Sequence, residues 1–153
     1  MPDKVKIGSK IPSFSLKDQN GNDFSINDLL GKKNLVIYFY PKDDTPGCTK
    51  EACSFRDSYE DFQGFGAEVI GISDDGQQKH QEFSQKHDLP FILLSDNKKE
   101  VRRLFGVPTN LLGFLPGRVT YVVDKKGIVR HIFNSQMNPS KHISESKKIL
   151  SKL

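Results

Sequence analysis

A run of six apolar residues, Leu35 to Tyr40, restricts the fold of this chain more than any other feature. A strand with one exposed face alternates apolar and polar residues, whereas a strand covered on both faces is apolar at every position. Pro41 follows the run and stops it. The sequence therefore predicts a central strand in a sheet that is covered on both faces.

Strand and helix patterns alternate on either side of this run. The other expected strands are 13–16, 23–25, 68–73, 91–94, 119–123 and 128–132, and turn residues join the first two and the last two as hairpins. One expected helix carries Ala52, Phe55, Tyr59 and Phe62, a second ends near residue 86, and two more span 98–105 and about 140–150. This order predicts an α/β fold: a three-layer sandwich with a mixed central sheet flanked by helices and an N-terminal β-hairpin. No repeat or linker divides the 153 residues, so one domain over 1–153 is expected.

Charge and hydropathy exclude several classes of partner. The net charge is +4, but acidic and basic residues alternate along most of the chain, which favours a solvated surface over nucleic-acid binding. The longest apolar run is far shorter than the roughly 20 residues that span a bilayer, so no membrane association is expected. The first residues lack the apolar core of a signal peptide, which predicts a cytoplasmic protein, or one in an organelle stroma if a transit peptide was removed.

The chain has only two cysteines, Cys48 and Cys53, and both fall at the start of an expected helix. A domain of this size does not need a disulfide for stability, and in a reducing compartment a close pair of cysteines indicates catalysis or metal binding. Cys48 is expected in the first helical turn, where unpaired backbone N–H groups and the helix dipole favour a thiolate. Cys53 lies deeper in the same helix and is expected to be inert while that helix is intact.

Helix geometry keeps the two cysteines apart. Five residues of helix rise and rotate so that the two Cα atoms lie about 8.6 Å from one another. A disulfide needs a Cα separation of no more than about 7 Å. A bond between Cys48 and Cys53 therefore requires at least the first helical turns to unwind.

The spacing alone leaves other interpretations open. Two buried, unreactive cysteines are common in cytosolic domains. A zinc site is weakly supported because the four histidines show no pair at metal-ligand spacing, and no metal is expected. A thioredoxin-type reductase separates its cysteines by two residues, whereas four residues separate them here.

The segment Pro41-Lys42-Asp43-Asp44-Thr45-Pro46-Gly47-Cys48 resembles the peroxiredoxin signature, in which Pro, Thr and Cys occupy positions 1, 5 and 8. The continuation from Thr49 to Asp57, which includes Cys53, resembles the bacterioferritin-comigratory-protein or peroxiredoxin Q branch of that family. The resemblance extends from Gly8 to the final helix and includes the segment Leu115 to Tyr121.

This resemblance implies a thioredoxin-like fold and thiol-dependent reduction of hydrogen peroxide and organic hydroperoxides. It implies that Cys48 is the peroxidatic cysteine and that Cys53 resolves it through an intramolecular disulfide. Thr45 and Arg118 would complete the catalytic site, with Pro41 shielding it. Thioredoxin or a similar dithiol would restore the thiols, the protein would be a monomer, and no metal, flavin or haem would be needed.

The side-chain chemistry of the implied site is consistent with these roles. Arg118 is expected at the start of a strand, from which its guanidinium could hold both a thiolate and peroxide oxygens; a surface arginine is the alternative. The Thr45 hydroxyl could cap the helix or bind a substrate oxygen. Glu51 could orient Arg118 or simply favour the helix N-terminus. The apolar segment 110–115 could be an exposed loop beside the site or a buried one.

Two other functions remain open on the sequence. A thiol–disulfide oxidoreductase on the same fold would reduce insulin, and the four-residue spacer together with Thr45 argues against it. A non-enzymatic redox-sensing module would use the same disulfide as a switch and need not turn over with thioredoxin.

Overall fold

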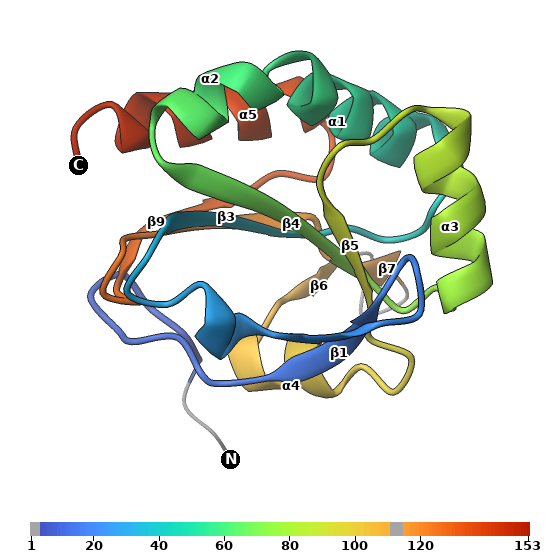
Figure 1. The fold of residues 1–153 in the computed structure, drawn as a ribbon, viewed down its shortest axis with the longest axis horizontal. Helices are drawn as coiled ribbons and strands as arrows, with labels where there is room; N and C mark the ends of the chain where they lie inside the picture. Colours follow the sequence, from blue (N-terminus) through green and yellow to red (C-terminus); the bar gives the residue numbers. More distant parts are fainter. Residues whose placement is uncertain (1–3, 111–114) are drawn as a thin grey trace.

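A seven-stranded mixed sheet runs through the computed structural model, which describes residues 4–110 and 115–153 (Figure 1). Its strands are β1 (Ser15–Asp18), β2 (Asp23–Ser25), β3 (Asn34–Phe39), β4 (Ala67–Ser73), β5 (Ile92–Ser95), β8 (Val119–Val123) and β9 (Val129–Asn134). They lie in the order β2-β1-β5-β4-β3-β8-β9. The strands β3, β4 and β5 are parallel, whereas β1 and β8 run antiparallel to their neighbours. The expected mixed sheet with an N-terminal hairpin is confirmed.

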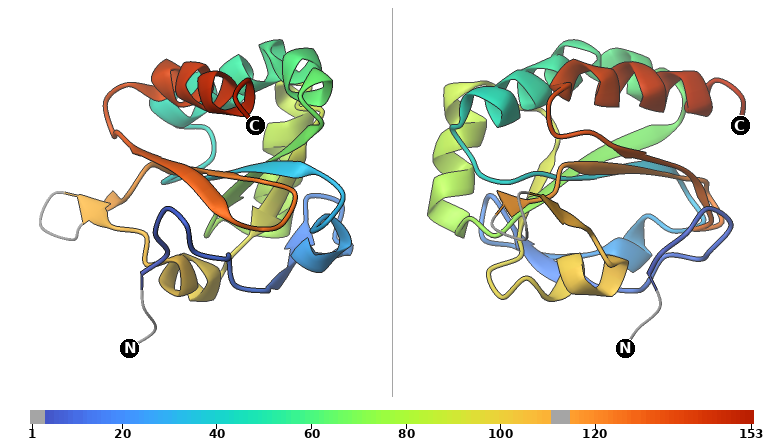
Figure 2. Two further views of the ribbon diagram at one scale, coloured as in Figure 1. Left: turned by 90° about the vertical axis from the view of Figure 1, so that its left-hand side faces the viewer. Right: turned by 180° about the vertical axis from the view of Figure 1, so that it is seen from behind.

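Five helices cover this sheet on two sides. They are α1 (Pro46–Asp57), α2 (Tyr59–Gly64), α3 (Gln77–Lys86), α4 (Glu100–Phe105) and α5 (Pro139–Leu150), and a short 3-10 turn spans Ile26–Asp28. Helices α1, α2 and α5 form one layer, while α4 lies on the opposite side together with the β1–β2 hairpin (Figures 1 and 2). The predicted three-layer sandwich is therefore confirmed.

The apolar run in β3 explains why both faces need a cover. Every residue of β3 is buried, and successive side chains enter opposite halves of the core. Leu35, Ile37 and Phe39 pack on the α4 side, whereas Val36 and Tyr38 pack on the α1 side. The ring of Tyr38 stacks on Phe55 of α1 with centroids 4.6 Å apart, which holds that helix against the sheet.

The helical pattern from Ala52 to Phe62 is interrupted in the structure. The backbone of Ser58 leaves the helical region with φ −103° and ψ 8°, and α2 begins after it. Serine is a weak helix former, so apolar spacing alone did not reveal the break.

The segment expected as a loop over 106–117 contains a two-stranded ladder. Strand β6 (Thr109–Asn110) pairs antiparallel with β7 (Leu115–Pro116). Most of the expected apolar loop at 110–115 lies outside the described residues.

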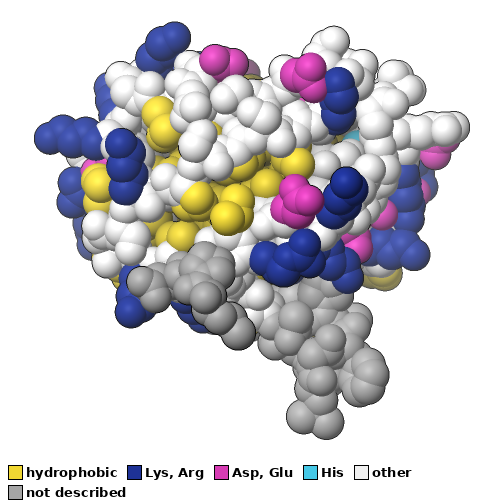
Figure 3. Space-filling model, turned by 90° about the horizontal axis from the view of Figure 1, so that it is seen from below, with side chains coloured by type: hydrophobic (Ala, Val, Ile, Leu, Met, Phe, Trp, Pro, Cys, Tyr) yellow, Lys and Arg dark blue, Asp and Glu magenta, His cyan; other side chains and the backbone are white. Residues whose placement is uncertain are grey.

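An apolar groove of about 510 Å³ lies on the α4 side of the sheet, where apolar side chains gather when the molecule is seen from below (Figure 3). Its lining residues are Lys4, Val5, Lys6, Ile7, Pro108, Val119, Tyr121, Ile132 and Asn134. Val119 and Tyr121 face the opposite half of the core from Cys48, so the groove is separated from the thiol by the sheet. Among the described helices, none has the length and apolarity needed to cross a bilayer.

Candidate active site

Cys48 lies in the first turn of α1, as expected. Thr45 is the N-cap residue with an extended backbone, and its carbonyl accepts the first helical hydrogen bond from the N–H of Thr49 at 2.8 Å. Pro46 begins the helix, a position where its missing N–H costs nothing. The Cys48 side chain is only 1% exposed, so its sulfur is held inside the α1 side of the core.

Arg118 is brought to this sulfur by the pairing of β8 with β3. Phe39 pairs with Val119, so Arg118 lies beside the end of β3 where the loop to Cys48 begins. Its Nη2 donates to the Cys48 Sγ at 3.4 Å, and its Nη1 donates to Glu51 Oε1 at 2.7 Å. Arg118 is 4% exposed, so the alternative of a surface arginine is wrong.

Gly47 leaves room for this guanidinium. A Cβ atom added at Gly47 would lie 3.0 Å from Arg118 Nη2. Burial by itself lowers the pKa of Arg118, but the charges of Glu51 and Cys48 outweigh it and place that pKa above its ordinary value. Arg118 therefore stays cationic beside the thiol at every physiological pH.

Glu51 completes the contacts of Arg118 from the next turn of α1. It is fully buried, and burial raises the pKa of its carboxyl to about 8 although Arg118 acts in the opposite direction. Its Oε2 has no hydrogen-bond partner among the described residues, and the nearest ring nitrogen is His142 Nδ1 at 3.5 Å. The orienting role expected for Glu51 agrees with this geometry.

His142 on α5 is a neighbour of the site that the sequence did not reveal. Its Nε2 lies 2.8 Å from the Ser135 carbonyl, and its Nδ1 lies 2.7 Å from Thr120 Oγ1. A carbonyl only accepts, so Nε2 carries the proton and Nδ1 accepts from the threonine hydroxyl. Burial lowers the pKa of His142 to about 4, with Arg118 acting in the same direction, so the ring is neutral. Its place on the buried face of α5 with Ile143, Ser146 and Leu150 was the available signal.

Thr45 and Pro41 lie on the loop that leads to Cys48. Of the two roles left open for the Thr45 hydroxyl, capping of the helix is not found, because Oγ1 donates to the Lys42 carbonyl at 2.9 Å instead. That bond closes the loop on itself and leaves the oxygen lone pairs as possible acceptors. Pro41 is half-buried directly after Tyr40, at the end of β3.

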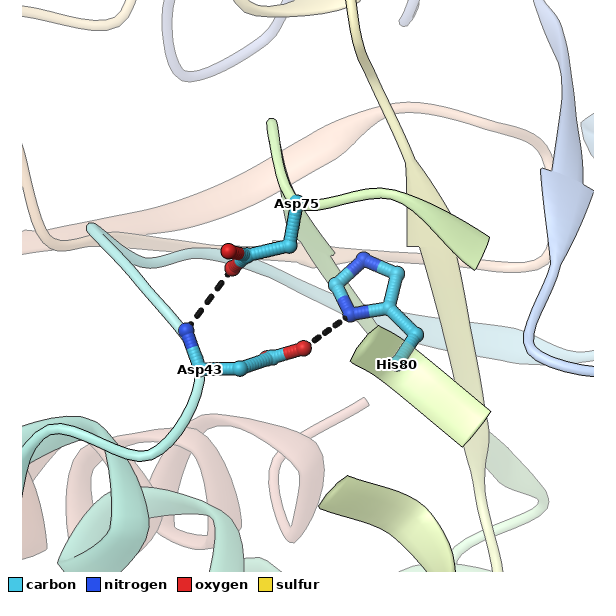
Figure 4. A group of neighbouring side chains, drawn as sticks. All are labelled: Asp43, Asp75 and His80. Atoms are coloured by element: carbon cyan, nitrogen blue, oxygen red, sulfur yellow. Dashed lines mark hydrogen bonds and ion pairs between the residues drawn. The ribbon is translucent and has the colours of Figure 1, made fainter. Parts of the chain in front are cut away.

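Asp43 anchors the same loop, a role that the sequence did not reveal (Figure 4). The Asp43 carboxylate accepts from Tyr40 Oη at 2.5 Å and contacts His80 Nδ1 at 2.5 Å. Its backbone N–H donates to Asp75 Oδ2 at 2.7 Å. Asp43, Asp75 and His80 are all buried, so the loop is tied to β4 and α3 by polar bonds that water does not reach.

These three residues are also the group, among those described, whose side chains could hold a metal. Their candidate ligand atoms lie within 4.8 Å of one another. Those atoms already have partners, since Ser73 Oγ donates to Asp75 Oδ2 at 2.7 Å and His80 Nε2 lies 3.0 Å from the Leu94 carbonyl. The donor set therefore fits a loop anchor better than a cation site.

Cys53 follows Cys48 on the same continuous helix. Both residues are free thiols, and Cys53 is half-buried. Because α1 is regular over Pro46–Asp57, the predicted separation of about 8.6 Å between the two Cα atoms applies, and a disulfide does not fit this conformation.

Comparison with known proteins assigns this arrangement to a family. The model of the AhpC/TSA family matches residues 7–132. The chain is 55% identical over 150 residues to chloroplastic peroxiredoxin Q of Oryza sativa subsp. japonica, covering 98% of this chain and 69% of that protein. It is 55% identical over 147 residues to chloroplastic peroxiredoxin Q of Arabidopsis thaliana, covering 96% of this chain and 68% of that protein.

Solved structures agree in fold and in family. A crystal structure of the peroxidoxin BcpB from Mycobacterium tuberculosis superposes with a TM-score of 0.90 at 35% identity, covering 97% of this chain and 98% of that one. A Xanthomonas campestris peroxiredoxin Q structure gives a TM-score of 0.82 at 29% identity, covering 91% of this chain and 90% of that one. The fold is thus thioredoxin-like, and the chain belongs to the AhpC/TSA family as a thiol peroxidase of the peroxiredoxin Q branch.

Proposed function

We propose that Cys48 is the residue that attacks the peroxide in this thiol peroxidase. The observation that carries the proposal is the contact of Arg118 Nη2 with Cys48 Sγ at 3.4 Å in the first turn of α1. A guanidinium and a helix N-terminus both stabilise a thiolate, which is the nucleophilic form of cysteine. Cys53 lies half-buried farther along the helix, beyond its first turn.

The first step transfers one oxygen atom to Cys48. The thiolate attacks an oxygen of the hydroperoxide, the O–O bond breaks, and hydroxide or alkoxide leaves and takes a proton from water. Cys48 becomes a sulfenic acid. Arg118 donates to the oxygen on which negative charge develops, and Glu51 holds Arg118 in place through the 2.7 Å bond.

Thr45 and Pro41 are proposed to complete the pocket for the peroxide. The Thr45 hydrogen is committed to the Lys42 carbonyl, so its oxygen is the atom that would accept a hydrogen bond from the hydroperoxide. Pro41 offers an apolar ring without a donor at the loop entrance, which would limit the access of water.

The second step forms a disulfide between Cys48 and Cys53. The Cys53 thiol gives up its proton, its thiolate attacks the Cys48 sulfur, and the sulfenic oxygen leaves as hydroxide that takes up a proton to become water. The first turns of α1 must unwind for this step. The segment that is proposed to move lies between the anchor at Asp43 and the stack of Phe55 on Tyr38.

The family reduces peroxides and is recycled by a thioredoxin-type dithiol, and an alkyl peroxide reduction activity is named for the related Xanthomonas campestris protein. We propose that alkyl hydroperoxides are also substrates of this chain. We further propose a single domain over 1–153, a monomer, no binding of nucleic acid or membrane, and a location in the cytoplasm or in an organelle stroma. Two buried clusters on the two faces of one sheet support the single domain, and the named chloroplastic relatives support the stroma.

Intact-mass spectrometry after one equivalent of hydrogen peroxide tests the cysteine roles. The wild-type chain is expected to lose two hydrogens, and Cys53→Ser is expected to retain an oxidised Cys48. Cys48→Ser is the matched variant and should not react. Rapid oxidation of Cys48→Ser by one equivalent of peroxide would overturn the assignment.

A further inference from the structure

Arg102 is a buried cation that the peroxidase cycle above does not use. It lies on α4, on the other side of the sheet from α1, and is 7% exposed. No carboxylate oxygen lies within ion-pair distance of its guanidinium in the described part of the chain. A buried charge without a paired charge lowers stability, so its contacts call for a functional explanation.

The guanidinium donates to two backbone carbonyls. Its Nη2 lies 3.2 Å from the Tyr40 carbonyl, and its Nη1 lies 3.2 Å from the Gly117 carbonyl. Tyr40 directly precedes Pro41, where the loop to Cys48 begins, and Gly117 directly precedes Arg118. Arg102 therefore contacts the two segments that carry the thiol and its guanidinium partner.

The β3–β8 ladder ends at this point. Its last residue pair is Phe39 with Val119, so Tyr40 and Arg118 lie just beyond the paired region. From there the two segments diverge: Tyr40 leads toward α1, and Arg118 leads back toward β7. The guanidinium of Arg102 joins these two segments, because its two terminal nitrogens are held in one rigid plane and each donates to a different carbonyl.

Arg102 is itself held in place. The Asp96 carboxylate accepts from the backbone N–H of Arg102 at 2.9 Å and from that of Val101 at 3.1 Å, which fixes the first turn of α4. The guanidinium lies over the Phe39 ring, 5.6 Å from its centroid. Burial lowers the pKa of Arg102, and the charges of Asp74 and Asp96 act in the opposite direction.

The Gly117 end of the bridge is also fixed by packing. A Cβ atom added at Gly117 would lie 2.1 Å from the Pro108 carbonyl oxygen, so the backbone at this position fits only a glycine. The Gly117 carbonyl therefore cannot readily move toward a shorter side chain that replaces Arg102.

We propose that Arg102 is a positioning residue for peroxide reduction, which bridges the Tyr40 and Gly117 carbonyls and thereby keeps Arg118 aligned with Cys48. The inference rests on the proposed role of Cys48 and deepens it. Misplacement of a catalytic group by a fraction of an ångström to 1 Å lowers rates by one to two orders of magnitude. A lysine keeps the charge, but its donors share one nitrogen on a flexible stem and lack the rigid two-nitrogen fork that spans the two carbonyls.

The test compares Arg102→Lys and Arg102→Gln with Arg103→Lys, all as full chains. Arg103 is the matched control, because it is the next residue of α4 and its exposed side chain bonds only to the Lys98 carbonyl. Rapid chemical quench followed by intact-mass spectrometry gives the rate of Cys48 oxidation and the rate of the following disulfide formation separately. Thermal unfolding gives the folded fraction for each variant.

We expect Arg102→Lys to slow Cys48 oxidation about tenfold and Arg102→Gln by more, with disulfide formation within twofold of wild type. Arg103→Lys should leave both rates unchanged. A merely structural role would lower the melting temperature without this selective loss in the first step. A folded Arg102→Lys variant whose oxidation rate is within twofold of wild type would overturn the proposal, and so would an equal loss in both steps. If Arg102→Gln fails to fold, Arg102→Lys decides.

Failure of this proposal is distinguishable from failure of the proposed function. If Cys48 were not the residue that attacks the peroxide, intact mass would show oxidation of Cys48→Ser. If only the role of Arg102 were wrong, Cys48→Ser would stay unreactive while Arg102→Lys reacted like wild type.

Discussion

Two buried carboxylate–histidine pairs flank Cys48, and they differ in how completely their hydrogen bonds are made. Asp43 precedes the cysteine and faces His80, and both of its carboxylate oxygens have partners. Glu51 follows the cysteine and faces His142, and its Oε2 has no hydrogen-bond partner among the described residues. A satisfied buried network is rigid, whereas an unsatisfied one costs free energy and persists where it serves chemistry. This difference indicates that Asp43 and His80 support the loop, whereas Glu51 and His142 belong to the reactive site.

The hydrogen-bond partners of the two histidine rings also differ. His80 Nε2 faces the Leu94 carbonyl, and the other ring nitrogen, Nδ1, faces the Asp43 carboxylate, so both nitrogens have a partner. His142 Nδ1 has its lone pair turned toward Thr120 and Glu51. A protonated Glu51 removes the repulsion between the two acceptors, in agreement with a pKa of about 8.

Removal of the Asp43 carboxylate should have the largest effect. Asp43→Ala leaves Tyr40 Oη and His80 Nδ1 buried without their acceptor, which should lower the free energy of unfolding by about 3 kcal/mol. The melting temperature should fall by roughly 6–12 °C in scanning calorimetry. Asp44→Asn is the control, since that side chain is about half exposed and bonds to Lys86. Equal melting temperatures for Asp43→Ala and Asp44→Asn would remove the distinction between anchor and surface.

The second-largest effect is expected from the titration of Glu51, which should make the free energy of unfolding depend on pH. Its pKa is raised by burial to about 8 in the native state, so between the unfolded value and pH 8 the native chain holds a proton that the unfolded chain has lost. The free energy of unfolding therefore falls as pH rises through this window. His142, with its pKa lowered to about 4, acts in the opposite direction up to its unfolded value near 6.5. Between about pH 6.5 and 8 His142 no longer opposes Glu51, whose titration then lowers the free energy of unfolding by about 2 kcal/mol.

Glu51→Gln should flatten that part of the curve. The amide can still accept from Arg118 with its oxygen, and it has no proton to lose over this pH range. Urea unfolding at pH 6.5, 7.2 and 8 measures the free energy of unfolding of both chains. Parallel curves for wild type and variant over this range would show that Glu51 is not the group that titrates.

The hydroxyl of Thr120 should contribute less. Thr120→Val removes the donor to His142 Nδ1 at nearly constant volume and should cost about 1 kcal/mol in urea unfolding. Thr120→Ser keeps the hydroxyl and serves as the matched variant. If the serine and valine chains unfold at the same urea concentration, the hydrogen bond does not stabilise His142.

The smallest effect is expected at the edge of the satisfied pair. Lys79 Nζ lies 3.3 Å from Asp75 Oδ1, but its side chain is 41% exposed and Asp75 keeps its bonds to Asp43 and Ser73. Lys79→Ala should therefore change stability by less than about 0.5 kcal/mol. A loss above about 1 kcal/mol in the same measurement would mean that the anchor depends on this surface charge.

Much of the fold followed from local pattern. The apolar run in β3 and the helical spacing around Phe55 depend on periodicity, which a single sequence displays. The break at Ser58 and the β6–β7 ladder depend on backbone torsions and on pairing between short segments, for which the sequence carried weak signals.

The site was predictable to the extent that a motif held it. The motif from Pro41 to Cys48 placed Cys48 and Thr45 on one loop, and the resemblance pointed to Arg118. Arg102, His80 and His142 come from α4, α3 and α5, and only the tertiary packing of these helices brings the first two to the loop and the third to Glu51 of α1. Their common signal is a polar residue on the buried face of a helix, as His80 shares a face with Phe83 three residues later.

The regularity of α1 bears on the thermodynamics of the proposed cycle. Helix and disulfide exclude one another, so each destabilises the other by the same free energy. Whatever strengthens α1, including the packing of Phe55 on Tyr38, therefore makes the disulfide a stronger oxidant and eases its reduction by a dithiol. Refolding of the helix is thus part of the driving force that returns the protein to its reduced form.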